Sequence, residues 1–347
     1  MANKNLNQAK NAKKDEFYTQ LVDIENELKH YKAHFKGKTV LCNCDDPRVS
    51  NFFHYFSYNF EQLGLKKLIT TCYKNQNRDL FSQNDAEQAI WLEYYGDRNG
   101  NRVPDPEEIG IHYFKGDGDF RSQECIELLK EADIVVTNPP FSLFREFFAW
   151  IVSANKRFLM IGNINAITYK EIFPYVRDGK VWLGATGFMT DMVFGVPKGT
   201  VVKASDKAKA ERLGFKGDYT RLGNSCWFTN LDHGRRHKPL ELMTMEDSIR
   251  YSKHKQIAGH GYARYDNYNA IEIPFIDAIP SDYNETMGVP ITFLDKHCLE
   301  QFEIVGATES EGRGFSEGLW HEESGITQPL INGNRIYKRI FIRKKQK

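Results

Sequence analysis

Between residues 39 and 162, short apolar segments alternate with longer amphipathic segments, and this alternation constrains the fold more than any other feature. Short apolar runs suit strands that helices bury on both faces. The expected strands are 39–44, 67–73, 111–114, 133–137 and 157–162, and the expected helices are 51–63, 122–131 and 142–154. The pattern predicts an α/β fold with a doubly wound, mostly parallel sheet, whose ligands bind beyond the carboxyl ends of the strands.

The alternation ends near residue 180. The later strand-like segments 181–184, 192–196 and 226–230 have no intervening helices, and five prolines punctuate the chain beyond residue 232. A length of 347 residues is enough for two domains. The expected division is a flexible basic arm at 1–14, an α/β domain at 15–235 with a basic insertion near 198–216, and an irregular second region at 236–347.

The charge distribution is more informative than the net charge, which is only +1. Residues 1–14 carry four lysines and no acid, residues 198–216 carry six basic residues against two acidic ones, and residues 337–347 are strongly basic. Such patches on a neutral chain fit local contact with a phosphate backbone, although ordinary solvated surface is the alternative. Within the central patch, the candidate phosphate contacts are Lys203, Lys207 and Lys209.

Neither a membrane segment nor a metal site is expected. No apolar run reaches the 18 or so residues that a spanning helix needs, and the N-terminus lacks the apolar core of a signal peptide, so we expect a cytoplasmic protein. Cys42 and Cys44 are spaced as buried reduced thiols rather than as zinc ligands. A calcium-loop pattern near residue 100 fails because Arg102 stands where glycine is required, and His30 and His34 lack a third ligand.

The tetrapeptide Asn138-Pro139-Pro140-Phe141 directly follows the expected strand 133–137 and precedes an amphipathic segment. Two prolines stiffen this turn, which holds an amide, a carbonyl and an aromatic ring close together. Transfer of a methyl group to an aromatic amine needs hydrogen-bond acceptors rather than a strong base, because the lone pair of the amine is delocalised into the ring. The Asn138 side chain and the Pro139 carbonyl are the candidate acceptors, and Phe141 is the candidate stacking partner of a flipped base.

With these residues in place, the chain resembles the adenine-specific DNA methyltransferases, and most closely the EcoRI modification methylase family. Residues 138–141 resemble the N-P-P-[FY] catalytic motif of that superfamily. Three further segments resemble family motifs in the same order along the chain, and they are 15–20, 42–53 and 116–120. The segment 288–295 is also similar to the family, but its chemistry cannot be read from the sequence.

The resemblance implies a catalytic domain at 15–235 that binds S-adenosylmethionine, and a target-recognition region at 236–347. The cofactor-binding residues that it implies are Phe17, Tyr18, Thr19, Asp45, Asp46, Pro47, Asp117 and Asp119. One departure concerns the first turn, at 45–50, which is usually rich in glycine in methyltransferases and here contains none.

The function that we expect is transfer of a methyl group from S-adenosylmethionine to N6 of a flipped adenine in double-stranded DNA at a specific short site. A monomer is expected, and a restriction endonuclease that acts on the same site is an implied companion without direct contact. Two alternatives remain at this point. The same tetrapeptide also serves methyltransferases of RNA or of protein glutamine amides, and the glycine-free turn is compatible with an inactive DNA-binding protein.

Overall fold

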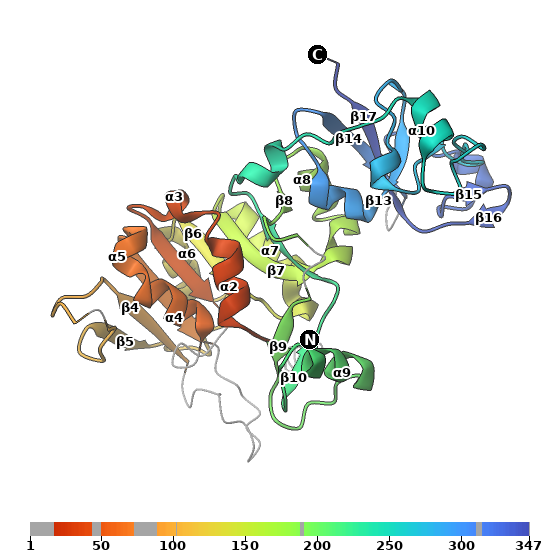
Figure 1. Cartoon of the computed structure of the whole chain (residues 1–347). Coiled ribbons are helices and arrows are strands. Elements are labelled where there is room, and N and C mark those ends of the chain that lie inside the picture. Colours follow the sequence, from red (N-terminus) through yellow and green to blue (C-terminus); the bar gives the residue numbers. More distant parts are fainter. Residues whose placement is uncertain are drawn as a thin grey trace. The chain divides into compact units, whose positions relative to one another are not determined.

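The computed structural model describes residues 17–43, 50–72, 89–101, 103–187, 191–309 and 314–346. The basic arm at 1–14 and the cofactor candidates Asp45, Asp46 and Pro47 lie outside these residues. The chain forms two compact units, one of Met1–Ile164 with Gly184–Asp232 and one of Asn165–Leu183 with His233–Lys347 (Figure 1). The short excursion 165–183 into the second unit has no counterpart in the expected division of the chain.

The first unit contains all the strands expected between residues 39 and 162, together with elements that the sequence pattern did not reveal. Its helices are α2 (Leu21–Leu28), α3 (Lys32–Phe35), α4 (Asn51–Tyr58), α5 (Phe60–Leu63), α6 (Gln123–Glu131), α7 (Phe144–Ser153), α9 (Ala204–Arg212) and the 3-10 turn η1 (Phe141–Leu143). Its strands are β1 (Tyr18–Thr19), β2 (Thr39–Asn43), β3 (Lys67–Cys72), β4 (Ile90–Tyr94), β5 (Ile109–Tyr113), β6 (Ile134–Thr137), β7 (Arg157–Asn163), β9 (Val193–Gly195), β10 (Tyr219–Arg221) and β11 (Ser225–Thr229).

Seven of these strands form a mixed sheet in the order β5-β4-β3-β2-β6-β7-β11. The four central strands β3, β2, β6 and β7 are parallel, whereas β4, β5 and β11 pair antiparallel to their neighbours. An α/β fold is therefore correct, but the prediction of a mostly parallel sheet is wrong outside the central strands. The reason is local, because β4 and β5 form a hairpin and so contribute two antiparallel strands to one edge of the sheet.

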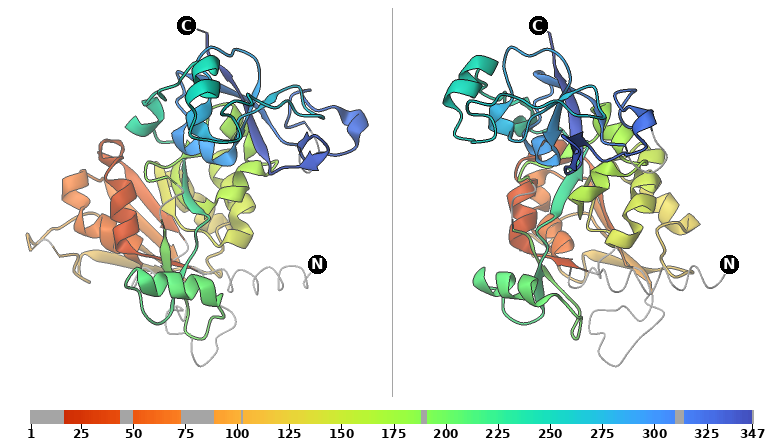
Figure 2. Two further views of the ribbon diagram at one scale, coloured as in Figure 1. Left: turned by 45° about the vertical axis from the view of Figure 1, so that its right-hand side comes forward. Right: turned by 90° about the vertical axis from the view of Figure 1, so that its right-hand side faces the viewer.

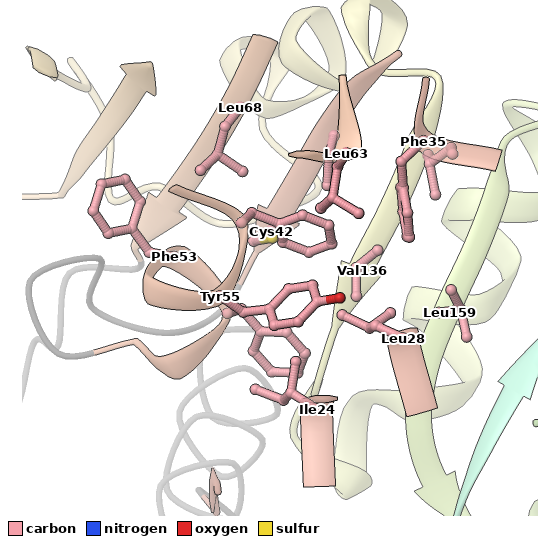
Figure 3. Close-up of a cluster of buried hydrophobic side chains, with 14 of the residues drawn as sticks. Ile24, Leu28, Phe35, Cys42, Phe53, Tyr55, Leu63, Leu68, Val136 and Leu159 are labelled. Atoms are coloured by element: carbon pink, nitrogen blue, oxygen red, sulfur yellow. The ribbon is translucent and has the colours of Figure 1, made fainter. Parts of the chain in front are cut away.

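Helices cover both faces of the parallel core, with α2, α4 and α5 on one side and α6 and α7 on the other (Figure 1). Alternate strand residues such as Val40, Cys42 and Val136 face the first side, where they join a buried cluster with the aromatic residues of α4 (Figure 3). Two helices begin at serine caps, since Ser50 Oγ accepts the Phe53 N–H at 3.4 Å and Ser122 Oγ accepts the Cys125 N–H at 3.2 Å. The helix expected at 51–63 is interrupted at residue 59 and forms α4 and α5.

A second, three-stranded sheet in the first unit joins β1, β9 and β10 in that order through β9. Tyr18 pairs with Gly195 and Thr19 with Phe194 in an antiparallel register. Helix α9 lies between β9 and β10 in the chain, within the basic insertion, and packs against β10. This small sheet connects the basic insertion to the N-terminal segment that carries Phe17.

The second unit is built around a four-stranded sheet in the order β12-β13-β17-β14 (Figure 2). Its helices and 3-10 turns are η2 (Ile164–Thr168, which begins at the last residue of the first unit), α8 (Phe173–Arg177), η3 (Gly234–His237), α10 (Met245–Tyr251), η4 (Ile276–Ala278), η5 (Ile291–Lys296) and η6 (Glu322–Ser324). Its strands are β8 (Trp182–Leu183), β12 (Ile271–Glu272), β13 (Met287–Pro290), β14 (Phe302–Ala307), β15 (Leu330–Ile331), β16 (Asn334–Arg335) and β17 (Arg339–Lys344). The segment 288–295, noted in the sequence, spans β13 and η5.

Candidate active site

The residues Asn138 to Phe141 follow β6 in the middle of the sheet, where the chain turns into η1 and α7. The carboxyl ends of β2 and β6 are tied together directly, because the Thr137 hydroxyl donates a hydrogen bond to the Asn43 carbonyl. The Pro140 carbonyl accepts the Leu143 N–H at 2.9 Å and closes the first turn. The motif therefore occupies the edge of the sheet at which an open α/β fold binds its ligands.

The side chain of Asn138 is held in one orientation. Its Nδ2 donates a hydrogen bond to the Phe17 carbonyl at 2.5 Å, and the side chain is only 6% exposed. Its Oδ1 is buried and has no hydrogen-bond partner among the described residues. A buried acceptor without a hydrogen-bond donor costs about 1–3 kcal/mol of folding free energy. A ligand that donates a hydrogen bond to Oδ1 would remove this cost.

Three phenylalanine rings pack together at Phe17, the residue whose carbonyl binds this amide. The Phe17 and Phe141 ring centroids are 5.6 Å apart at 46°, and those of Phe17 and Phe194 are 5.9 Å apart at 61°. Phe141 is only partly buried, so it packs against the core and is also partly accessible to solvent. Phe194 lies in β9, opposite Thr19 of β1, so the small sheet positions the segment that holds Asn138.

The neighbouring residues of β1 are fixed from the other side by α4. Asn51 Nδ2 donates to the Thr19 carbonyl at 2.7 Å. Thr19 is 2% exposed, and its hydroxyl has no hydrogen-bond partner in the part of the chain that the structure describes. Of the N-terminal cofactor candidates, Phe17 contacts the catalytic motif through its hydrogen bond with Asn138. Tyr18 and Thr19 follow it in β1.

Asp117 and Asp119 lie in a tight turn near the end of β3. Gly118 has φ +76°, and a methyl group there would lie 2.8 Å from the Cys72 carbonyl, so only glycine fits. Asp117 Oδ1 accepts the Asp119 N–H at 3.0 Å. The Asp119 carboxylate is bound instead by Arg121, with Oδ2 at 2.6 Å from Nη2.

The environment of Asp119 also keeps it ionised. Burial opposes the charged form, but hydrogen bonds from the Arg121 side chain and backbone outweigh that effect and hold the pKa of Asp119 below its usual value. Arg121 in turn contacts Glu146 of α7 at 2.8 Å. Asp119 is therefore committed to a structural ion pair, and Asp117 is the carboxylate of this turn that remains for a ligand.

The three candidate phosphate contacts lie at α9. Lys203 is the residue before the helix, and Lys207 and Lys209 lie within it; all three side chains are exposed. Lys203 and Lys207 are four residues apart and share one side, whereas Lys209 lies about 200° around the helix from Lys207. Ala210 is the buried residue by which α9 packs. A phosphate backbone that followed one side of α9 would therefore meet either the pair or Lys209, but not all three.

Sequence reasoning missed Glu27, which is fully buried in α2. Its carboxylate accepts the Ala185 N–H at 2.6 Å, the Thr186 N–H at 2.8 Å and the Tyr31 hydroxyl at 2.7 Å. Burial and the nearby Glu27 charge raise the pKa of Tyr31. A methyl group on Gly184 would overlap the Glu27 carboxylate. Glu27 thus anchors the segment that leads into β9, but its partners are too distant in sequence for any local pattern to reveal them.

Comparison with known proteins settles the family. A family model described as "Adenine-specific methyltransferase EcoRI" matches residues 5–345. The chain is 44% identical over 345 residues to the Type II methyltransferase M.EcoRI of Escherichia coli, which covers 99% of this chain and 97% of the relative. The chain belongs to the EcoRI adenine-specific methyltransferase family. It is also 36% identical to M.MpnI of Mycoplasma pneumoniae, over 98% of both chains.

Membership of the EcoRI methyltransferase family confirms the predicted resemblance and makes the chain a DNA adenine methyltransferase of the restriction–modification type. M.MgeORF184P of Mycoplasma genitalium, also a Type II methyltransferase, is 36% identical over 98% of this chain and 99% of its own length. No solved structure matches the chain. Within the described residues, no helix is long and apolar enough to cross a membrane, and no group of three or more His, Cys, Asp or Glu side chains is placed to hold a metal ion.

Proposed function

We propose that the chain transfers the methyl group of S-adenosylmethionine to N6 of an adenine that is flipped out of double-stranded DNA, at a specific short site. The observation that carries this proposal is the unpaired, buried Oδ1 of Asn138, whose amide is fixed by the Phe17 carbonyl. This oxygen can only accept a hydrogen bond, and the N6 amino group of adenine is a donor of matching geometry.

The chemistry follows from what acceptors do to an aromatic amine. Hydrogen bonds from the amino protons to Asn138 Oδ1 and to the Pro139 carbonyl draw the nitrogen towards tetrahedral geometry and localise its lone pair. Because Asn138 Nδ2 is already bonded to Phe17, the amide does not rotate to present its NH2 group instead. The lone pair would then take the methyl group as its bond to the sulfonium breaks, with the neutral thioether as leaving group, and the amino proton would pass to solvent.

S-adenosylmethionine supplies an electrophilic methyl group on a sulfonium. We assign its binding to Phe17, Tyr18 and Thr19 and to the Asp117 turn, with Asp45, Asp46 and Pro47 completing the set outside the described residues. Two observations support a polar ligand at this edge of the sheet, as expected for the class I, Rossmann-like methyltransferase fold that we propose. The Thr19 hydroxyl is buried without a partner, and the glycine turn at 118 brings the backbone close to the end of β3.

The burial of Asn138 Oδ1 is the reason for proposing that the base is flipped. An adenine within a duplex does not reach an oxygen that is buried behind side chains at the end of a strand, so the base leaves the stack before it reacts. Phe141 is partly exposed and packs on Phe17, and we assign to it the stacking contact with the flipped base. In the same proposal, the second unit provides target recognition, the enzyme acts as a monomer, and a cognate endonuclease acts separately on the same site.

One assay separates this proposal from its alternatives. Wild-type protein is incubated with methyl-labelled S-adenosylmethionine and, in parallel, with duplex DNA, structured RNA or a glutamine-containing peptide. Label in duplex DNA alone is the expected result. Label in RNA or peptide contradicts the proposed acceptor, and absence of label in every sample, with intact cofactor binding, identifies an inactive binding protein.

A further inference from the structure

The second unit carries a short hairpin formed by β15 and β16. Leu330 pairs with Arg335 and Ile331 pairs with Asn334, so only two residues join the strands. These two residues, at 332 and 333, have φ of +50° and +76°, which is the geometry of a type I′ turn. An Asn-Gly pair is the sequence most suited to this turn. The hairpin is therefore a sharply defined element rather than an irregular loop.

The turn and stem of this hairpin are tied to the rest of the unit. The Asp266 carboxylate accepts the N–H groups of Asn332 and Gly333 at 3.2 and 2.8 Å. Asn267, which is 1% exposed, accepts the Leu330 N–H at 2.9 Å through its side-chain oxygen. The same asparagine donates from Nδ2 to two carbonyls of the preceding loop at 2.7 and 3.0 Å. These contacts hold both the turn and the first strand.

The chain that leaves the hairpin is held as firmly. Arg339 donates to the backbone carbonyls of Tyr337 and Lys338 at 3.1 and 3.3 Å. Its guanidinium also binds Glu272 at 2.6 Å, and the two side chains are only 11% and 8% exposed. The buried ion pair of Arg339 and Glu272 thus holds the backbone of the exposed segment 337–338. Because this segment is already ordered, binding a partner costs it less conformational entropy.

The two faces of the hairpin differ in chemistry. Ile331 and Ile336 pack against a buried cluster that includes Trp320 and Phe341. Since side chains alternate along a strand, Arg335 of β16 points to the opposite face, and Tyr337 follows two residues later in the chain. Tyr337 is 86% exposed, and the Arg335 guanidinium makes no ion pair within the described residues. Figure 1 shows β15 and β16 at one end of this unit, away from β13.

We propose that this hairpin is a sequence-reading element, in which Arg335 contacts a guanine in the major groove and Tyr337 packs beside it; the proposal rests on the proposed function. The major groove of B-DNA admits a two-stranded ribbon, and guanine presents two acceptors there that match the guanidinium fork. Residues 330–338 contain two basic residues and no acidic one, which suits approach to DNA. A pre-ordered backbone and an unpaired arginine are what base readout requires.

The test begins with the site itself. Wild-type enzyme methylates a library of randomised DNA duplexes, and sequencing that detects N6-methyladenine gives its preferred site. The kcat/KM values for all single base-pair changes in that site are then measured for Arg335→Ala, Arg335→Lys and Asn334→Ala. Asn334 is the matched control because it lies in the same hairpin on the other face.

The expected result is that Arg335→Ala lowers discrimination at one G·C position by about 5- to 150-fold and leaves the other positions unchanged. Arg335→Lys relaxes the same position, because an ammonium group does not reproduce the bidentate contact. Asn334→Ala keeps the wild-type profile. All three variants unfold at the wild-type temperature, since no buried contact is lost.

Two outcomes overturn the inference while leaving the proposed function intact. One is unchanged discrimination at every position in Arg335→Ala. The other is a uniform loss of affinity, with a salt slope lower by about one unit that Arg335→Lys restores, which identifies a phosphate contact. If wild-type enzyme methylates no duplex, the proposed function fails, and the inference that rests on it fails as well.

Discussion

Replacing Asn138 with alanine removes its Oδ1 and its Nδ2, and different measurements report the loss of each atom. Loss of Oδ1 removes an acceptor for the reacting amine, which costs about 2.7–4 kcal/mol at the transition state, or roughly 100- to 1,000-fold in the methyl-transfer rate. Loss of Nδ2 leaves the partly buried Phe17 carbonyl without its donor, but loss of the unpaired Oδ1 removes a penalty of similar size, so the free energy of unfolding is expected to fall by no more than about 1 kcal/mol. Cofactor affinity is expected to change by no more than a few fold, because Asn138 is assigned to the base and not to the cofactor.

Single-turnover rates at saturating DNA, urea unfolding and cofactor calorimetry measure these three effects separately. Asn230→Ala is the matched control, since Asn230 accepts the Phe158 N–H at 2.8 Å and donates to the Lys156 carbonyl at 3.0 Å at the opposite end of β7. It is expected to lose stability and keep its rate. If Asn138→Ala loses only stability, or if both variants lose rate equally, the acceptor role of Asn138 is refuted.

Three further predictions concern packing, protonation and DNA contact. Gly162→Ala places a methyl group against the Phe144 ring and is expected to lower the free energy of unfolding by about 1–3 kcal/mol in urea titrations; wild-type stability contradicts this packing. Burial raises the pKa of Asp23 to about 6 although the Val193 N–H opposes the rise, so its stabilising contribution is present below about pH 4 and is lost as pH rises through about 6. Asp23→Asn is therefore expected to be about 1–2 kcal/mol more stable than wild type at pH 8, after discounting for partial exposure, and equally stable at pH 4; a gap that is constant with pH refutes this. The third variant replaces Lys203, Lys207 and Lys209 with alanine. The slope of its log DNA affinity against log salt concentration is expected to fall by about two units, because two of the three lysines share one side of α9. An unchanged slope would mean that these lysines do not contact DNA.

The central part of the fold could be predicted because its signals are local. Each parallel strand is a short apolar run, and the Asn138 motif directly follows one of them, so the pattern itself indicated the ligand-binding edge of the sheet. Strand β4 was not predicted, so its hairpin with β5, which was expected at 111–114, and the resulting antiparallel edge of the sheet were missed. These two strands alternate in burial or are partly exposed, and this signal is weaker than a fully apolar run.

Other parts depend on contacts that no local pattern contains. Helix α9 is almost entirely polar, with Ala210 as its one buried residue, so it has no apolar stripe to reveal it. Glu27 looks like an ordinary helix glutamate until the fold brings Thr186 to it from 159 residues away. The hairpin at residues 332–333 is a different case, because its Asn-Gly pair is a recognised turn signal that sequence reading passed over.

The account depends most on the claim that the unpaired Oδ1 of Asn138 serves the N6 amino group of adenine. Mass spectrometry of nucleosides from duplex DNA treated with enzyme and S-adenosylmethionine tests this claim directly, with Asn138→Ala in parallel. The account predicts N6-methyl-2′-deoxyadenosine as the sole methylated nucleoside with wild-type enzyme, formed at least about a hundredfold more slowly by the variant. Methylation at a different atom, or equal rates for the two proteins, would contradict it.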